Sequence, residues 1–106
     1  MASEDVLKRL RNFNERRDWG QFHTEANLAK SISIEAGELL ECFQWSDEFD
    51  SNRVQEEVAD VLTYAYLLAD RMGLDPEQVI LDKLAITEQK YPVEKARGRA
   101  DKYDQL

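Results

Sequence analysis

Apolar residues recur at three- and four-residue steps along almost the whole chain, which is the period of an amphipathic α-helix. The pattern is interrupted at a few short stretches, and the chain has two prolines and four glycines. These residues are too few for the many turns of a β-sandwich or barrel. The sequence therefore predicts an all-α fold in which about four helices form an antiparallel bundle.

Local signals mark the ends of the first two predicted helices. Ser3 is a candidate N-cap for the first helix, whose pattern fades over residues 16–18. Its apolar face consists of Val6, Leu7, Leu10 and Phe13. Residues 19–23 are predicted to form a loop. Thr24 is then a candidate N-cap for a second helix, which is predicted to run to about Trp45.

The third and fourth helices are predicted in the same way. A polar connection over residues 46–51 leads to a helix over residues 52–72, and Gly73 suits the left-handed position that follows it. Residues 75–78 then supply an aspartate cap, a proline at the first helical position and a glutamine two positions later. This fourth helix is predicted to end near Lys90, since proline follows shortly after it.

The chain length of 106 residues predicts one domain spanning residues 1–106, with a polar tail from about residue 93 that lies on its own surface or on a partner's. A chain this short buries a modest core, so association into oligomers is an expected source of stability. Cys42 is the single cysteine, the first ten residues lack a signal-type apolar core, and no apolar run is long enough for a membrane span. We expect a cytoplasmic protein without a membrane partner.

The net charge of −8 argues against binding to a nucleic acid polymer, which needs a basic surface. An acidic protein can still bind a nucleoside triphosphate when divalent cations lie between its carboxylates and the phosphates. Such a protein is expected to depend strongly on metal.

Two glutamates interrupt the apolar seams of the second and third helices. The seam of the second helix reads Leu28, Ile32, Glu35, Leu39, Cys42. The seam of the third reads Val54, Glu57, Val61, Tyr64, Leu68. Glu38 lies one turn after Glu35, and Asp60 one turn after Glu57, so each helix carries an acidic pair on one face. Gly37 lies within the first pair at a cost of roughly 1 kcal/mol relative to alanine, which suggests that another group approaches the backbone there.

Packing along these seams would bring four carboxylates together. Buried carboxylates need a partner, and basic residues on these two helices lie toward the helix ends. Clustered oxygen ligands suit Mg²⁺, with Mn²⁺ as a substitute. A single such pair is common on solvent-exposed helices and means little, whereas two pairs on adjacent apolar seams favour a metal site.

The two pairs and their surroundings resemble the MazG-like all-α nucleoside triphosphate pyrophosphohydrolases, and within them the dCTP pyrophosphatase branch. The resemblance extends from about Arg11 to Tyr103. It rests on the segments RDWGQFH over residues 17–23, EAGELLECFQW over residues 35–45 and EEVADVLTY over residues 56–64. It continues through Lys83, residues 91–92 and residues 97–103.

The resemblance implies a helical bundle that forms a dimer or homotetramer, with active sites near subunit interfaces. It implies that Mg²⁺ is held by Glu35, Glu38, Glu57 and Asp60. It assigns the base and sugar pocket to Trp19, His23 and Trp45, with Tyr64 helping to shape it, and the phosphate contacts to Lys83, Arg97, Lys102 and Tyr103. Each of these satellite residues also has an ordinary structural interpretation as a loop, core or solvated side chain.

The chemistry implied is a house-cleaning reaction that converts a nucleoside triphosphate such as dCTP to the monophosphate and pyrophosphate. The mechanistic hypothesis is metal-assisted attack of water on the α-phosphorus, for which Glu41 is a further candidate to orient the water. Relatives carry an asparagine shortly after the equivalent of Lys83, whereas this chain has Thr87 and Glu88 there. The base preference is therefore open.

Three other interpretations compete with this one. A non-enzymatic adaptor that dimerises through its apolar seams would explain the helices and the acidity, although not the carboxylates on the core side. A di-iron carboxylate bundle needs Glu-x-x-His pairs, and the single histidine, His23, lies outside both acidic pairs. A third alternative keeps the fold but acts on a different or modified deoxynucleoside triphosphate.

Overall fold

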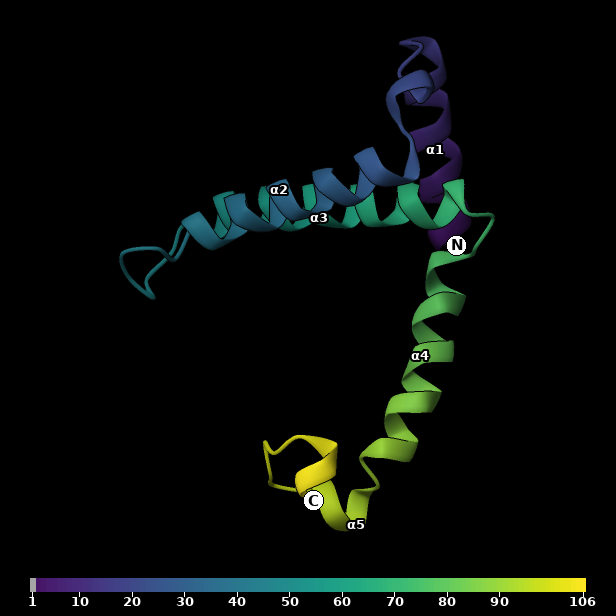
Figure 1. Cartoon of the computed structure of the whole chain (residues 1–106). Coiled ribbons are helices and arrows are strands. Elements are labelled where there is room, and N and C mark those ends of the chain that lie inside the picture. Colours follow the sequence, from purple (N-terminus) through teal and green to yellow (C-terminus); the bar gives the residue numbers. More distant parts are fainter. Residues whose placement is uncertain (1) are drawn as a thin grey trace. The chain divides into compact units, whose positions relative to one another are not determined.

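The computed structural model describes residues 2–106, with side chains described from Glu4 onward. The elements are α1 (Ala2–Arg16), η1 (Gly20–Phe22), α2 (Glu25–Glu41), α3 (Ser51–Arg71), α4 (Pro76–Lys90), α5 (Val93–Ala96) and η2 (Tyr103–Gln105) (Figure 1). Residues 2–106 contain no strand, so the all-α prediction is confirmed. No helix in this range combines the length and apolarity that crossing a bilayer requires.

The chain forms two compact units, Met1–Pro76 and Glu77–Leu106, and each is described by itself. In the first unit, α2 and α3 lie side by side and antiparallel, while α1 packs against α3 (Figure 1). The centre of this unit is one leucine from each helix: Leu7, Leu28 and Leu67 are all buried. The single domain and the antiparallel four-helix bundle remain predictions.

The apolar seams lie where the periodicity predicts them. Every seam position of α2, from Leu28 to Cys42, is buried or half-buried, and so is every seam position of α3, from Val54 to Leu68. Burial of such a seam is the main source of stability for a helix of this length. Glu35 and Glu57 therefore share the contact face between the two helices with apolar side chains.

Two adjacent residues at the end of α3 connect it to both neighbouring helices. Asp70 accepts two hydrogen bonds from the Arg11 guanidinium on α1, one of them from Nε at 2.9 Å. Arg71 Nε donates to Glu25 Oε1 on α2 at 2.9 Å. Hydrogen bonding to Arg11 holds the pKa of Asp70 below its usual value, so this carboxylate stays charged in the folded state.

Several predicted helix ends are confirmed by their caps. The Thr24 hydroxyl accepts a hydrogen bond from the Asn27 backbone N–H at 3.1 Å, and α2 begins at the next residue. Gly73 has a φ of 73°, the left-handed conformation expected after α3. α4 begins at Pro76 and ends at Lys90 as predicted. The side chain of Ser3, the predicted first cap, lies outside the described side chains.

Other boundaries differ from prediction. α2 ends at Glu41 rather than near Trp45, and the chain continues in tight turns in which the Phe43 N–H donates to the Leu40 carbonyl at 2.9 Å. In this connection the Phe43 ring packs on Phe49 with centroids 5.1 Å apart, a contact that a continuous helix through Trp45 would not allow. The predicted loop at residues 19–23 contains the short helix η1, and the predicted tail contains α5 and η2.

Candidate functional site

Three carboxylates from the two acidic pairs converge between α2 and α3. One oxygen each of Glu35, Glu57 and Asp60 lies within 4.8 Å of the other two. Glu35 and Glu57 are half-buried on the facing seams, and Asp60 lies one turn further along α3 at the exposed edge. Helical periodicity places each acid on or beside the seam of its helix, and the packing of α2 against α3 brings the three carboxylates together. The group can hold a metal ion.

The electrostatics of this acidic group favour a cation. Burial and the negative charges of Asp60 and Glu57 raise the pKa of Glu35 above its usual value. Within residues 4–106, no hydrogen bond or ion pair to a basic side chain is formed by these three carboxylates. A divalent cation bound by these carboxylate oxygens would offset their negative charge, which the protein leaves uncompensated.

Glu38 lies beside the acidic group rather than within it. Its pKa is raised mainly by the negative charge of nearby Glu41, and less by burial and by the charges of Glu57 and Glu35. Glu41 also lies 3.9 Å from the Arg53 guanidinium in an exposed pair, which contributes little stability. The structure thus unites three of the four predicted ligands and places the fourth next to them.

Gly37 has open space around it within the described chain. A Cβ atom built on it would meet nothing within 4 Å. The close approach suggested by a glycine in mid-helix is therefore not made by any described residue of the same chain.

Gly37→Ala is expected to raise the free energy of unfolding by about 0.5–1 kcal/mol, because alanine restricts the unfolded chain and favours the helix. Chemical denaturation of the two proteins measures this difference. Ser33→Ala is the control, because it introduces alanine at another exposed α2 position and so measures the effect of helix propensity alone. A loss of stability in Gly37→Ala would mean that another molecule, such as a second copy of the chain, occupies the space beside Gly37.

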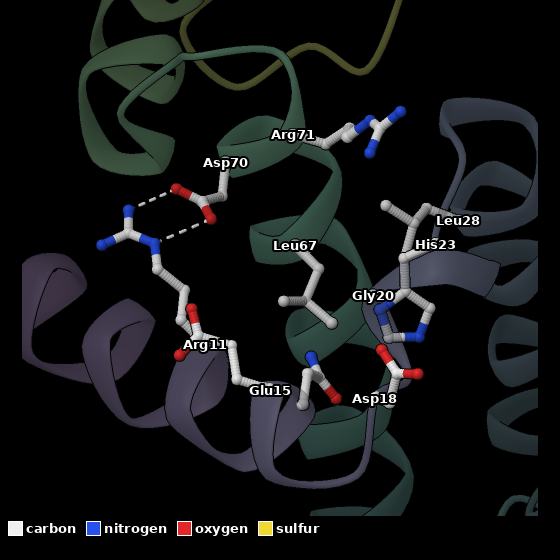
Figure 2. A pocket seen from close by; sticks show the side chains of 10 residues that line it. Arg11, Glu15, Asp18, Gly20, His23, Leu28, Leu67, Asp70 and Arg71 are labelled. Atoms are coloured by element: carbon white, nitrogen blue, oxygen red, sulfur yellow. Dashed lines mark hydrogen bonds and ion pairs between the residues drawn. The ribbon is translucent and has the colours of Figure 1, made fainter.

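A pocket of about 320 Å³ lies at the other end of the α2–α3 pair, where α1 and η1 meet it (Figure 2). Buried Leu28 and Leu67 line it together with the Arg11–Asp70 ion pair, and His23 points into it from the η1 side (Figure 2). Leu67 lies seven residues after Asp60 on α3, so the pocket begins roughly 10 Å along the helix from the acidic group.

Asn14 also lines this pocket and was missed by the sequence reasoning. It is 9% exposed, and its side-chain amide makes no hydrogen bond within the described residues. Asn14 lies seven residues after Leu7, so it continues the apolar stripe of the first helix and could have been found as a polar residue on a core face. His23 and Asn14 give this pocket two polar side chains that are open to a ligand.

The Trp19 ring is held in place by its neighbours on α1. Its edge packs on the Phe13 ring with centroids 5.6 Å apart at 72°, and the Arg17 guanidinium lies 3.7 Å from the Phe13 centroid. Asp18, just before Trp19, has a φ of 52°, and its backbone carbonyl accepts a hydrogen bond from the Gln21 side-chain amide at 2.9 Å. Aspartate is one of the few residues other than glycine that adopt this left-handed conformation, and the turn that it forms directly precedes Trp19.

The other predicted substrate residues are distributed widely. Trp45 is 89% exposed and follows α2, whereas Trp19 precedes it, so α2, with a length of roughly 25 Å, separates the two rings within one chain. Tyr64 is half-buried on the α3 seam. The remaining residues belong to the second unit: Lys83, Arg97, Lys102 and Tyr103. In that unit the Thr87 hydroxyl donates to the Lys83 carbonyl at 3.1 Å, so the residue near the family's asparagine position bonds to the backbone of its own helix.

Known proteins resemble this chain over most of its length. The dCTP pyrophosphatase 1 of Mus musculus is 37% identical over an alignment of 113 positions, which covers 97% of this chain and 66% of that protein. The Homo sapiens protein of the same name is 35% identical with the same coverage. The chain thus spans about two thirds of the length of these curated relatives.

A solved structure shares the fold. The crystal structure of a pyrophosphatase from Archaeoglobus fulgidus is 42% identical, with a TM-score of 0.78, over 84% of this chain and 91% of that one. The model of the MazG-like family matches residues 30–106, which include both acidic pairs. The sequence resemblance and the helical structure thus agree, and the chain belongs to the MazG-like family.

Proposed function

We propose that this protein is a metal-dependent nucleoside triphosphate pyrophosphohydrolase that converts a deoxynucleoside triphosphate such as dCTP to the monophosphate and pyrophosphate. The observation that carries the proposal is the convergence of Glu35, Glu57 and Asp60 without a basic partner, in a chain of the MazG-like family. The names of the relatives, dCTP pyrophosphatase 1 and a pyrophosphatase, support the same reaction class. A house-cleaning role in the cytoplasm is part of this proposal.

The proposed metal is Mg²⁺, with Mn²⁺ as a substitute, because the available ligands are carboxylate oxygens. Glu35, Glu57 and Asp60 would hold it, and Glu38 would join them by a change of rotamer. When bound, Mg²⁺ neutralises charge on the triphosphate and lowers the pKa of bound water. Glu35 and Glu57 are half-buried on the facing seams, so two of the proposed ligands are already positioned between the helices.

The other side chains supply orientation and charge. Glu41, whose negative charge raises the pKa of Glu38, is proposed to accept a hydrogen bond from the attacking water. We propose Trp19, His23, Trp45 and Tyr64 as contacts of the base and sugar. We propose Lys83, Arg97, Lys102 and Tyr103 as phosphate contacts. The positive charges of Lys83, Arg97 and Lys102 would stabilise the negative charge that builds up on the leaving pyrophosphate, and the Tyr103 hydroxyl would donate a hydrogen bond to it.

We also propose that the active protein is a dimer or tetramer in which its helices form a bundle of about four. Two observations support association. Large apolar side chains of α2 and α3 are exposed, among them Ile34, Leu40 and Leu62, in a unit with few buried apolar residues. In addition, Trp19 and Trp45 lie at opposite ends of α2, so both can line one pocket if two subunits contribute to it.

A panel of canonical and modified deoxynucleoside and ribonucleoside triphosphates tests the activity. Pyrophosphate release from each is measured with Mg²⁺, with Mn²⁺ and in EDTA. We expect release from at least one deoxynucleoside triphosphate with Mg²⁺ and none in EDTA. Release of inorganic phosphate instead, or no turnover of any triphosphate, would reject the proposed reaction. The panel also decides the base preference, which the altered Thr87 position leaves open.

A further inference from the structure

The last residues of the chain are folded into a loop by contacts within the second unit. We propose that Tyr91 and Arg99 are positioning residues that hold this C-terminal loop, residues 97–106, so that Arg97 and Lys102 are presented to the phosphates of the substrate. The inference deepens the proposed function and rests on it for the identity of the ligand.

Tyr91 holds the loop from the end of α4. Its hydroxyl oxygen accepts a hydrogen bond from the Tyr103 backbone N–H at 3.1 Å, across twelve residues of sequence. The two rings also pack edge to face, with centroids 6.2 Å apart at 79°. Lys90 Nζ lies 4.8 Å from the centre of the Tyr103 ring. Tyr103 is therefore fixed through both its backbone and its ring.

Arg99 closes the loop from inside. Its Nε donates to Asp101 Oδ2 at 2.8 Å, and a second guanidinium nitrogen donates to the Gln105 carbonyl at 3.2 Å. Gly98, just before it, has a φ of 76°, which lets the chain turn after α5. Arg99 thus connects the two halves of a segment that contains little regular structure.

These contacts divide the basic residues of the segment into two groups. Residues 90–102 contain five basic and two acidic side chains, in a protein whose net charge is −8. Lys90 and Arg99 are used within the loop, as described above. Lys95, Arg97 and Lys102 form no ion pair within residues 4–106. Of these three, Arg97 and Lys102 lie in the C-terminal loop, and Lys102 directly precedes the fixed Tyr103.

The division has a thermodynamic consequence. A flexible tail loses backbone entropy when it binds a polyphosphate, and this loss weakens affinity. A loop that Tyr91 and Arg99 already hold in place loses less backbone entropy on binding. Tyr91 and Arg99 should therefore increase substrate affinity only by positioning Arg97 and Lys102. Substitution of either should leave the rate of the chemical step unchanged.

Tyr91→Phe tests this because it removes the accepting hydroxyl and keeps the ring. With the triphosphate that the wild type cleaves best, we expect KM to rise about fivefold while kcat stays within about twofold. Hydrogen exchange at the Tyr103 amide should become faster. Arg99→Gln should behave in the same way. Tyr66→Phe is the matched control, since the Tyr66 hydroxyl on α3 makes no hydrogen bond within the described residues, and it should change neither quantity.

A double-mutant cycle separates positioning from direct contact. Lys102→Ala alone should raise KM without accelerating exchange at Tyr103. Adding Tyr91→Phe to Lys102→Ala should raise KM by much less than it does in the wild type, because both changes act on the same contact. Fully additive effects, or faster exchange at Tyr103 with an unchanged KM, would overturn the inference.

Failure of the proposed function is distinguishable from failure of this inference. If the wild type cleaves no triphosphate, the affinity of inorganic tripolyphosphate is measured in EDTA by calorimetry, where the basic side chains act without metal. The inference then requires weaker binding by Tyr91→Phe and unchanged binding by Tyr66→Phe. Equal affinities, or no binding by the wild type, would overturn it.

Discussion

Asp60→Asn is expected to lower kcat/KM for pyrophosphate release at least about a hundredfold, which corresponds to roughly 2.7 kcal/mol of transition-state stabilisation. The substitution preserves the size of the side chain and removes one of the three carboxylates that lie within 4.8 Å of one another. Glu57→Gln should have an effect of the same size, because its carboxylate comes from the neighbouring seam position of the same helix. Steady-state kinetics at saturating Mg²⁺ measures both.

Glu56→Gln is the matched control for these substitutions. Glu56 is adjacent to Glu57 in sequence, is exposed and lies outside the acidic group, so the net charge changes equally while the site is preserved. It should retain activity within about twofold of wild type. If Asp60→Asn and Glu57→Gln also retain activity within that range, the metal site has been assigned to the wrong residues.

Mg²⁺ should raise the melting temperature on the order of 10 °C at a concentration about one hundred times its Kd. Binding to the folded state alone contributes about 2.7 kcal/mol under that condition. One kcal/mol shifts the melting temperature of a chain of this size by roughly 4–8 °C. Glu35→Gln should abolish this shift. In EDTA the same variant should be more stable than wild type at neutral pH, because it removes one of the mutually repelling charges.

The pH dependence of stability in EDTA follows from the pKa of Glu35. Folding raises this pKa above the usual 4.5, so the folded chain holds the proton more tightly than the unfolded chain does. The contribution of Glu35 to the free energy of unfolding is therefore largest at acidic pH and falls as the pH rises from about 4.5 through the raised pKa. Glu35→Gln should remove this part of the pH dependence, and Glu56→Gln should keep it. A wild-type profile identical to that of Glu35→Gln would contradict the repulsion.

Features that depend on neighbouring residues could be predicted from the sequence. The Thr24 cap, the left-handed Gly73 and the start of α4 at Pro76 each follow from bonds formed within a few residues. The seams of α2 and α3 follow as well, because helical periodicity decides which side chains share a face. Knowledge of the seams was enough to expect carboxylates at the contact between the two helices.

The register between elements was decided by tertiary structure. Periodicity treats Glu38 and Asp60 alike, yet Asp60 joins the acidic group while Glu38 is beside Glu41, because the outcome depends on how α2 and α3 are offset along their axes. The pocket at Asn14 exists because α1 and η1 meet the α2–α3 pair, and the Tyr91–Tyr103 hydrogen bond joins residues twelve positions apart.

The acidic pairs depend on both local and tertiary structure. Helical periodicity places Glu35, Glu38, Glu57 and Asp60 on or beside two apolar faces, since that is a property of each helix taken alone. Tertiary structure decided that Glu35, Glu57 and Asp60 approach within 4.8 Å, since that distance depends on the packing of one helix against another. Packing of this kind is fixed by the fit of many side chains at once, which spacing along a single chain does not specify.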